Sequence, residues 1–121
     1  MNNLLIELFT SPAAETEAEP WATRFCAHQG LAALVMLVLV AALGVELALI
    51  ISLAAYAIWE TGQGLTVRTA PLWWDCALDW CAWALTSWGI AWLLWGQPWA
   101  ASGCGLASLA VLTVGVWRRA G

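Results

Sequence analysis

Four charged side chains lie close together in the sequence, between two strongly apolar segments. The stretch 59–80 reads WETGQGLTVRTAPLWWDCALDW and contains Glu60, Arg68, Asp75 and Asp79. Carboxylates can exchange protons or pair with cations, and an arginine can hold an anion. Asp75 and Asp79 are four residues apart, so on a helix they share one face, where two negative charges repel unless a cation lies nearby. The stretch is therefore a candidate binding or proton-transfer site.

The one histidine of the chain, His28 in the segment FCAHQG, is the other side chain suited to moving a proton. Cys26 and His28 would supply only two metal ligands, and no second cluster follows at metal-binding spacing, so we predict no metal site and no other cofactor. The four cysteines form no CxxC pair and are expected to be reduced thiols that pack as small hydrophobic side chains. The candidate cluster consists of His28, Glu60, Arg68, Asp75 and Asp79.

Composition identifies the environment of these residues. The chain has 121 residues, of which 63% are hydrophobic and 10% charged, and its mean hydropathy of +0.79 is too high for a water-soluble domain. The net charge of −4 excludes a basic surface for nucleic acid. We expect a membrane protein, with residues 1–20 as an interfacial and acidic tail and residues 21–121 as a single transmembrane helical domain. A frayed terminus is the alternative for the tail.

The number of membrane crossings depends on the first of three apolar runs. These runs are Leu31–Trp59, Leu72–Trp95 and Gly103–Trp117. One helix through the first run would be about 43 Å long, against a hydrocarbon core of about 30 Å. It would also place Glu46 near mid-membrane, at a cost of at least about 2.5 kcal/mol. A turn at Gly44–Glu46 avoids this and predicts spans at about Phe25–Leu43 and Leu47–Trp59.

The arginines distinguish the two topologies. Four spans place all four arginines on one side of the membrane, whereas three spans separate Arg24 from the others. We therefore predict an all-α integral membrane bundle of four short helices in the inner membrane, with both termini and Gly62–Pro71 in the cytoplasm. Gly44–Glu46 and Gly96–Ser102 would lie outside. A three-span bundle is the alternative, and only the four-span bundle brings His28 to the level of the three carboxylates.

Helical periodicity predicts which way the third span faces. Asp75 and Asp79 share a face with small or polar side chains, which should pack inside the bundle. The tryptophans on the opposite face should anchor the protein at the membrane boundaries. The first face comprises Asp75, Asp79, Ala82, Thr86, Gly89 and Leu93, and the second comprises Trp73, Trp80, Trp88, Trp92 and Trp95.

The order of these polar residues resembles that of the VanZ-like group of small membrane proteins. The resemblance covers about Arg24–Gly89. It rests on His28, Glu60, Gln63, Arg68, Asp75 and Asp79. It implies a four-helix membrane bundle with a polar cluster near one face, in a group linked to the cell envelope.

Two classes of function follow from these observations. The first is an envelope-associated protein whose cluster binds a lipid headgroup or small polar ligand, with Arg68 holding an anion and His28 or a carboxylate moving a proton. The second is a non-catalytic holin-like or assembly subunit that forms homo-oligomers in the membrane. Binding without catalysis is the favoured form of the first class. In both classes the main partner is the lipid bilayer.

Overall fold

The computed structural model describes the backbone of residues 17–67 and 70–121, and within these ranges every side chain except those of 63–67, 70–73 and 75. The described backbone folds into four helices. They are α2 (Ala18–Leu43), α3 (Val45–Val67), α4 (Ala70–Leu94) and α5 (Pro98–Ala120). The predicted all-α class is confirmed. Helix α2 begins inside the tail predicted for residues 1–20, and the rest of that tail, residues 1–16, lies outside the described residues.

Two glycines with positive φ separate the helices at one end of the bundle. Gly44 has φ 84° and stands alone between α2 and α3, and its N–H bonds to the carbonyl of Val40 at 2.9 Å. The predicted turn at Gly44–Glu46 is therefore shorter than expected, and Glu46 is an exposed residue of the first turn of α3. Gly96 has φ 73° and lies in the connection between α4 and α5, where its N–H bonds to the carbonyl of Leu93 at 3.0 Å. Left-handed backbone of this kind favours glycine because it has no Cβ.

The predicted loops at Gly62–Pro71 and Gly96–Ser102 are wrong in extent. Helix α3 continues through Gly62 to Val67, and α4 already begins at Ala70. A glycine inside a helix costs only about 1 kcal/mol, and a proline is tolerated in the first turn, so neither residue type stops a helix that packs well. Helix α5 likewise begins at Pro98, whose fixed φ suits a first helical position.

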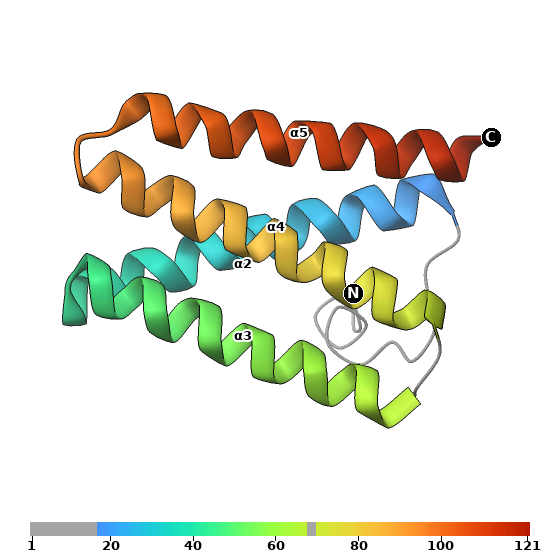
Figure 1. Cartoon of the computed structure of the whole chain (residues 1–121), viewed down its shortest axis with the longest axis horizontal. Coiled ribbons are helices and arrows are strands. Elements are labelled where there is room, and N and C mark those ends of the chain that lie inside the picture. The colour runs from blue at the N-terminus through green and yellow to red at the C-terminus, as the bar shows by residue number, and fades with distance from the viewer. Residues whose placement is uncertain (1–16, 68–69) are drawn as a thin grey trace, which may run out of the picture.

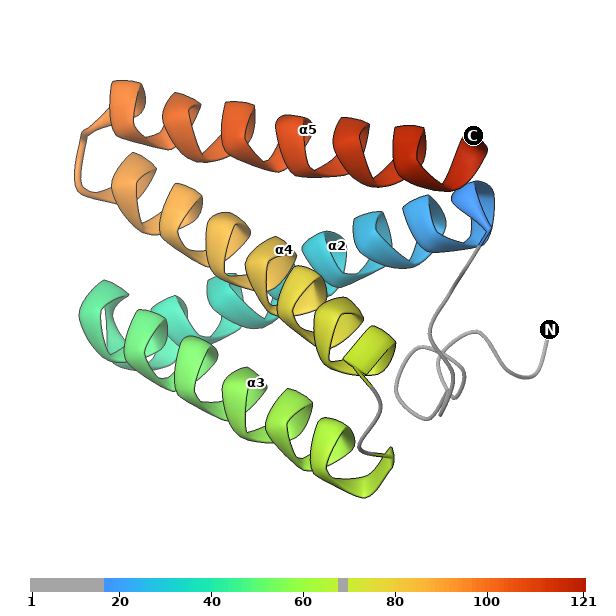
Figure 2. The same ribbon diagram turned by 45° about the vertical axis from the view of Figure 1, so that its right-hand side comes forward.

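Helix α4 occupies the centre of the bundle. It packs against α2, α3 and α5, and Figure 1 and Figure 2 show it running between α3 and α5 with α2 crossing behind. The buried side of α2 follows a spacing of three and four residues, as expected for a helix with one packed stripe. That stripe consists of Trp21, Phe25, His28, Ala32 and Met36.

Because α4 has three neighbours, its burial does not follow the single face predicted for it. Ala82 is fully buried, as expected, and Trp88 is exposed. Leu93, which was assigned to the packed face, is 58% exposed, whereas Trp83 is only 5% exposed. Trp83 belonged to neither predicted face. Of the tryptophans assigned to the outer face, Trp88 and Trp95 are exposed and Trp80 and Trp92 are half-buried.

Three of the described helical segments are long and apolar enough to cross a membrane: Ala18–Leu43, Val45–Gly62 and Pro98–Ala120. Their outward surfaces carry large aliphatic side chains, among them Leu34, Ile50 and Leu106. Helix α4 has a similar length of 25 residues but is not among these candidates. These helices are compatible with a membrane protein, and they give at least three candidate crossings.

Candidate functional site

Three members of the predicted cluster meet inside the bundle, each from a different helix. His28 lies on α2, Glu60 on α3 and Asp79 on α4, and one nitrogen or oxygen atom from each lies within 4.8 Å of the other two. His28 is 1% exposed, Glu60 5% and the Asp79 side chain 15%. The other two predicted members, Arg68 and Asp75, have side chains outside the described part of the chain.

The site lies toward the end of the bundle where α2 and α4 begin and where α3 and α5 end (Figure 1). The antiparallel order of neighbouring helices brings these ends together. The sequence-based expectation that His28 lies at the level of Glu60 and Asp79 is therefore confirmed. Glu46 and the Gly44 and Gly96 turns are at the opposite end.

Backbone contact orients His28. Its Nδ1 lies 2.8 Å from the carbonyl oxygen of Arg24, one turn earlier on α2. A carbonyl can only accept, so Nδ1 carries a hydrogen, and in the neutral ring Nε2 then presents the lone pair. The distance from Nδ1 to Oδ1 of Asp79 is 3.6 Å, which is too long for a direct hydrogen bond but close enough for a charge on either group to affect the other.

Glu60 is buried without full hydrogen bonding. Tyr56 and Cys76 lie near enough to interact with its carboxylate. Even so, Oε2 of Glu60 and the hydroxyl of Tyr56 have no hydrogen-bond partner among the described residues. A buried polar atom left without a partner typically costs about 1–3 kcal/mol, so it calls for an explanation such as a functional role or a bound ion.

A chain of aromatic and hydroxyl contacts supports the cluster from the interior of the bundle. The Tyr56 ring stacks on Trp83 with 4.2 Å between centroids, and it meets the His28 ring in an edge-on contact at 5.7 Å. The Trp83 indole N–H donates to the Ser52 hydroxyl at 2.8 Å, and that hydroxyl bonds to the Ser87 hydroxyl at 3.0 Å. The polar network therefore continues from the site toward the middle of α3 and α4.

Sequence reasoning missed these supporting residues, although a signal was available. Ser52 and Tyr56 precede Glu60 at steps of four residues on α3, and Trp83 and Ser87 follow Asp79 at the same step on α4. Residues four apart lie on one side of a helix. A search along the same helix face, at steps of four residues from Glu60 and from Asp79, would have found the hydroxyl and aromatic side chains that pack near the cluster.

A groove of about 320 Å³ opens beside Glu60 between α3 and α4. Its walls are mainly apolar, and Glu60 is its one charged residue among the described side chains. The lining consists of Ala57, Glu60, Thr61, Cys76, Ala77, Trp80 and Cys81. Glu60 therefore belongs both to the buried cluster and to an open surface.

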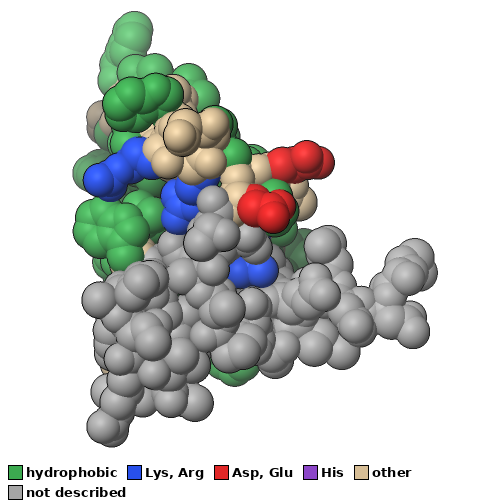
Figure 3. Space-filling view, turned by 90° about the vertical axis from the view of Figure 1, so that its right-hand side faces the viewer, with side chains coloured by type: hydrophobic (Ala, Val, Ile, Leu, Met, Phe, Trp, Pro, Cys, Tyr) green, Lys and Arg blue, Asp and Glu red, His purple; other side chains and the backbone are tan. Residues whose placement is uncertain are grey.

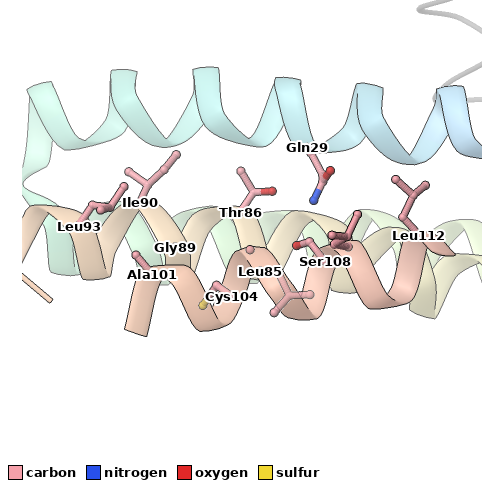
Figure 4. A pocket seen from close by; sticks show the side chains of 12 residues that line it. Gln29, Leu85, Thr86, Gly89, Ile90, Leu93, Ala101, Cys104, Ser108 and Leu112 are labelled. Atoms are coloured by element: carbon pink, nitrogen blue, oxygen red, sulfur yellow. The ribbon is translucent and has the colours of Figure 1, made fainter. Parts of the chain in front are cut away.

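A second, larger groove of about 410 Å³ lies between α4 and α5. Figure 4 shows Gln29 reaching toward it from α2, with Thr86 and Ser108 as further polar side chains and leucines around them. It contains no carboxylate or histidine. Of the three clustered residues, only Glu60 lines one of these two grooves.

Arginine side chains and acidic side chains are seen together on the end of the bundle nearest the site (Figure 3). Arg119, at the end of α5, lies 4.3 Å from the centroid of the Trp21 ring and donates a hydrogen bond to the carbonyl of Gly115 at 3.2 Å. The contact of Arg119 with the Trp21 ring joins the end of α5 to the start of α2. It also places a cation at the same end of the bundle as His28.

Comparisons of the chain with protein-family models, with curated proteins and with solved structures found no match.

Proposed function

We propose that this chain is a four-span membrane protein that binds the polar headgroup of a lipid or other envelope amphiphile at Glu60. The observation that supports this most directly is the double position of Glu60, which is buried against His28 and Asp79 and also lines the groove between α3 and α4. A headgroup with N–H or O–H donors would meet the carboxylates there. The apolar groove walls, including Trp80 and Ala57, would contact the apolar part of the lipid next to its headgroup.

The crossing of α4 is part of this proposal. Its 25 residues make a helix about 37 Å long, enough for a hydrocarbon core of about 30 Å. It packs against all three apolar helices, so its Trp83, Ser87 and Asp79 are shielded from lipid to a large degree. A central helix can be more polar than its neighbours because protein, not lipid, surrounds it.

The orientation follows from arginine placement. Arg24 near the start of α2 and Arg118 and Arg119 at the end of α5 lie at the same end of the bundle. Positive charge in short flanking segments favours the cytoplasmic side, so the cluster would lie near the cytoplasmic face of the inner membrane. Cysteine labelling tests this in a background that lacks the native cysteines. A cysteine at Gln97 should react from outside and one at Gly121 from inside, and reaction of both from one side would refute four spans.

Headgroup binding is tested by native mass spectrometry of the protein released from defined detergent–lipid mixtures. Phosphatidylethanolamine and phosphatidylglycerol carry donors in the headgroup, whereas phosphatidylcholine carries none. We expect the first two lipids to be retained in preference to the third, and Glu60→Gln to reduce this preference. Glu46→Gln, an exposed position at the other end of α3, is the matched control. Equal retention of all three lipids, or an unchanged preference in Glu60→Gln, would contradict the proposal.

This proposal concerns binding. It keeps the cell-envelope association implied by the VanZ-like resemblance as a prediction. The alternative, a holin-like subunit, predicts that expression of the wild-type chain lyses the host. The headgroup proposal predicts growth without lysis, so the two functions are separated by one culture experiment.

A further inference from the structure

The three clustered side chains have the composition of a metal site as well as of a hydrogen-bonded cluster. They supply one imidazole nitrogen and carboxylate oxygens from two residues, all from different helices and all within 4.8 Å. First-row divalent ions such as Mn²⁺, Fe²⁺ and Zn²⁺ accept this mixture of nitrogen and oxygen ligands. The sequence alone showed only Cys26 beside His28, and Cys26 is exposed on another side of α2.

The cluster combines two neighbouring carboxylates with one buried carboxylate oxygen that has no hydrogen-bond partner among the described residues. Two carboxylates lie together in a largely buried place, where like charges repel strongly. In addition, Oε2 of Glu60 is buried and makes no hydrogen bond within the described part of the chain. A divalent ion would neutralise both carboxylates and give that oxygen a partner.

The hydrogen bond that a metal-binding histidine usually makes with its other nitrogen is also present. A histidine that binds a metal usually donates its other ring N–H to a carbonyl or carboxylate, which fixes the tautomer. Here Nδ1 of His28 donates to the Arg24 carbonyl at 2.8 Å and lies 3.6 Å from Oδ1 of Asp79, so Nε2 is the nitrogen left to bind a metal once the ring and the carboxylates shift. The three ligand atoms lie within 4.8 Å of one another. Metal bonds of about 2.1 Å at tetrahedral angles would place them about 3.4 Å apart, so metal binding needs small side-chain movements.

We propose that His28, Glu60 and Asp79 bind one first-row divalent metal ion between α2, α3 and α4. Three protein ligands leave such an ion with open positions, at which water binds. Glu60 has two oxygens, so metal binding and contact with the groove do not exclude each other. The metal proposal goes beyond headgroup binding and does not depend on it.

The test uses the full chain in phosphatidylcholine nanodiscs, with Mn²⁺ alone as the probe and empty nanodiscs as the blank. Mn²⁺ favours oxygen and imidazole over soft thiolate ligands, so the four cysteines do not compete. We expect saturable binding of one Mn²⁺ per chain by electron paramagnetic resonance, with a coupling to an imidazole nitrogen in the pulsed spectrum. Absence of saturable binding, or of the nitrogen coupling, would overturn the proposal whether or not any variant folds.

Variants then assign the ligands. Glu60→Gln and Asp79→Asn keep side-chain size and should each weaken Mn²⁺ binding about a hundredfold or more, because even groups that only hydrogen-bond to a metal ligand account for about 10- to 100-fold in affinity. His28→Gln should abolish the nitrogen coupling. Glu46→Gln should bind as the wild type does. Wild-type affinity in the Glu60 or Asp79 variant, or an equal loss in the Glu46 variant, would refute the assignment.

The two proposals fail separately in these experiments. The nanodiscs contain only phosphatidylcholine, which has no headgroup donor, so a negative lipid-retention result leaves the Mn²⁺ result unaffected. Conversely, donor-dependent lipid retention without Mn²⁺ binding would leave the headgroup proposal standing and remove the metal.

Discussion

The contact between Gly115 of α5 and the ring of Trp21 on α2 allows a sharp test of the bundle. Gly115 is buried, and a Cβ added there would overlap atoms of the Trp21 ring. That ring is 2% exposed, lies against Phe25 with 5.3 Å between centroids and is covered by Arg119. Because neighbours hold the ring on several sides, it cannot move away cheaply. Gly115→Ala should therefore destabilise the fold.

The magnitude follows from two opposing effects. Replacing a helical glycine by alanine gains up to about 1 kcal/mol in helix propensity. Overpacking a close contact typically costs about 1–3 kcal/mol, and overlap with a confined aromatic ring belongs in the upper part of that range. The expected net loss in the free energy of unfolding is about 1–2 kcal/mol.

Gly103→Ala is the matched control. Gly103 lies on the same helix, is exposed, and has no atom within 4 Å of an added Cβ. It should gain the propensity term alone, so the difference between the two variants isolates the overpacking term of about 1–3 kcal/mol. Unfolding in mixed detergent–dodecyl sulfate micelles, followed by tryptophan fluorescence, measures both. Equal stability of Gly115→Ala and Gly103→Ala would refute the packing of α5 on Trp21.

Three further substitutions test the interior in the same unfolding assay. Tyr56→Phe removes a buried hydroxyl that bonds to nothing in the described structure, so stability should be unchanged or rise by up to about 1 kcal/mol, and a clear loss would show a missed bond. Ser52→Ala removes the acceptor of the Trp83 indole N–H and should cost about 1–3 kcal/mol, whereas no loss would mean that the bond is not formed. Ala82→Leu at a fully buried position should cost about 1–3 kcal/mol, and Trp88→Leu at an exposed one should be milder. The reverse order would contradict the orientation of α4.

Much of the candidate site was predictable because it depends on chain direction. Once Gly44 is recognised as a turn, α2 and α3 must run antiparallel, and His28 and Glu60 return to the same level. Asp79, near the start of the next helix, then joins them. The predicted loop around Gly62 was less accurate, because glycine weakens a helix by an amount that tertiary packing readily offsets.

The supporting residues were harder to predict for a different reason. Eleven tryptophans in an apolar chain favour the membrane boundary as their common location. Trp21 and Trp83 are instead buried, one against Gly115 and one between Tyr56 and Ser52. The amino-acid type is the same in each case, and only the neighbouring helices distinguish an anchor from a core residue.

By itself, the sequence determined the helical class, the membrane-compatible segments, the glycine turn and the common level of His28, Glu60 and Asp79. These properties depend on hydropathy, segment length and chain direction, which can be read along one dimension. The tertiary structure decided which atoms meet: that Glu60 is buried beside a groove, that Tyr56 stacks on Trp83, and that α4 is packed on several sides. Such contacts depend on how far each helix is rotated about its axis, and that rotation is set by side-chain packing between helices distant in sequence.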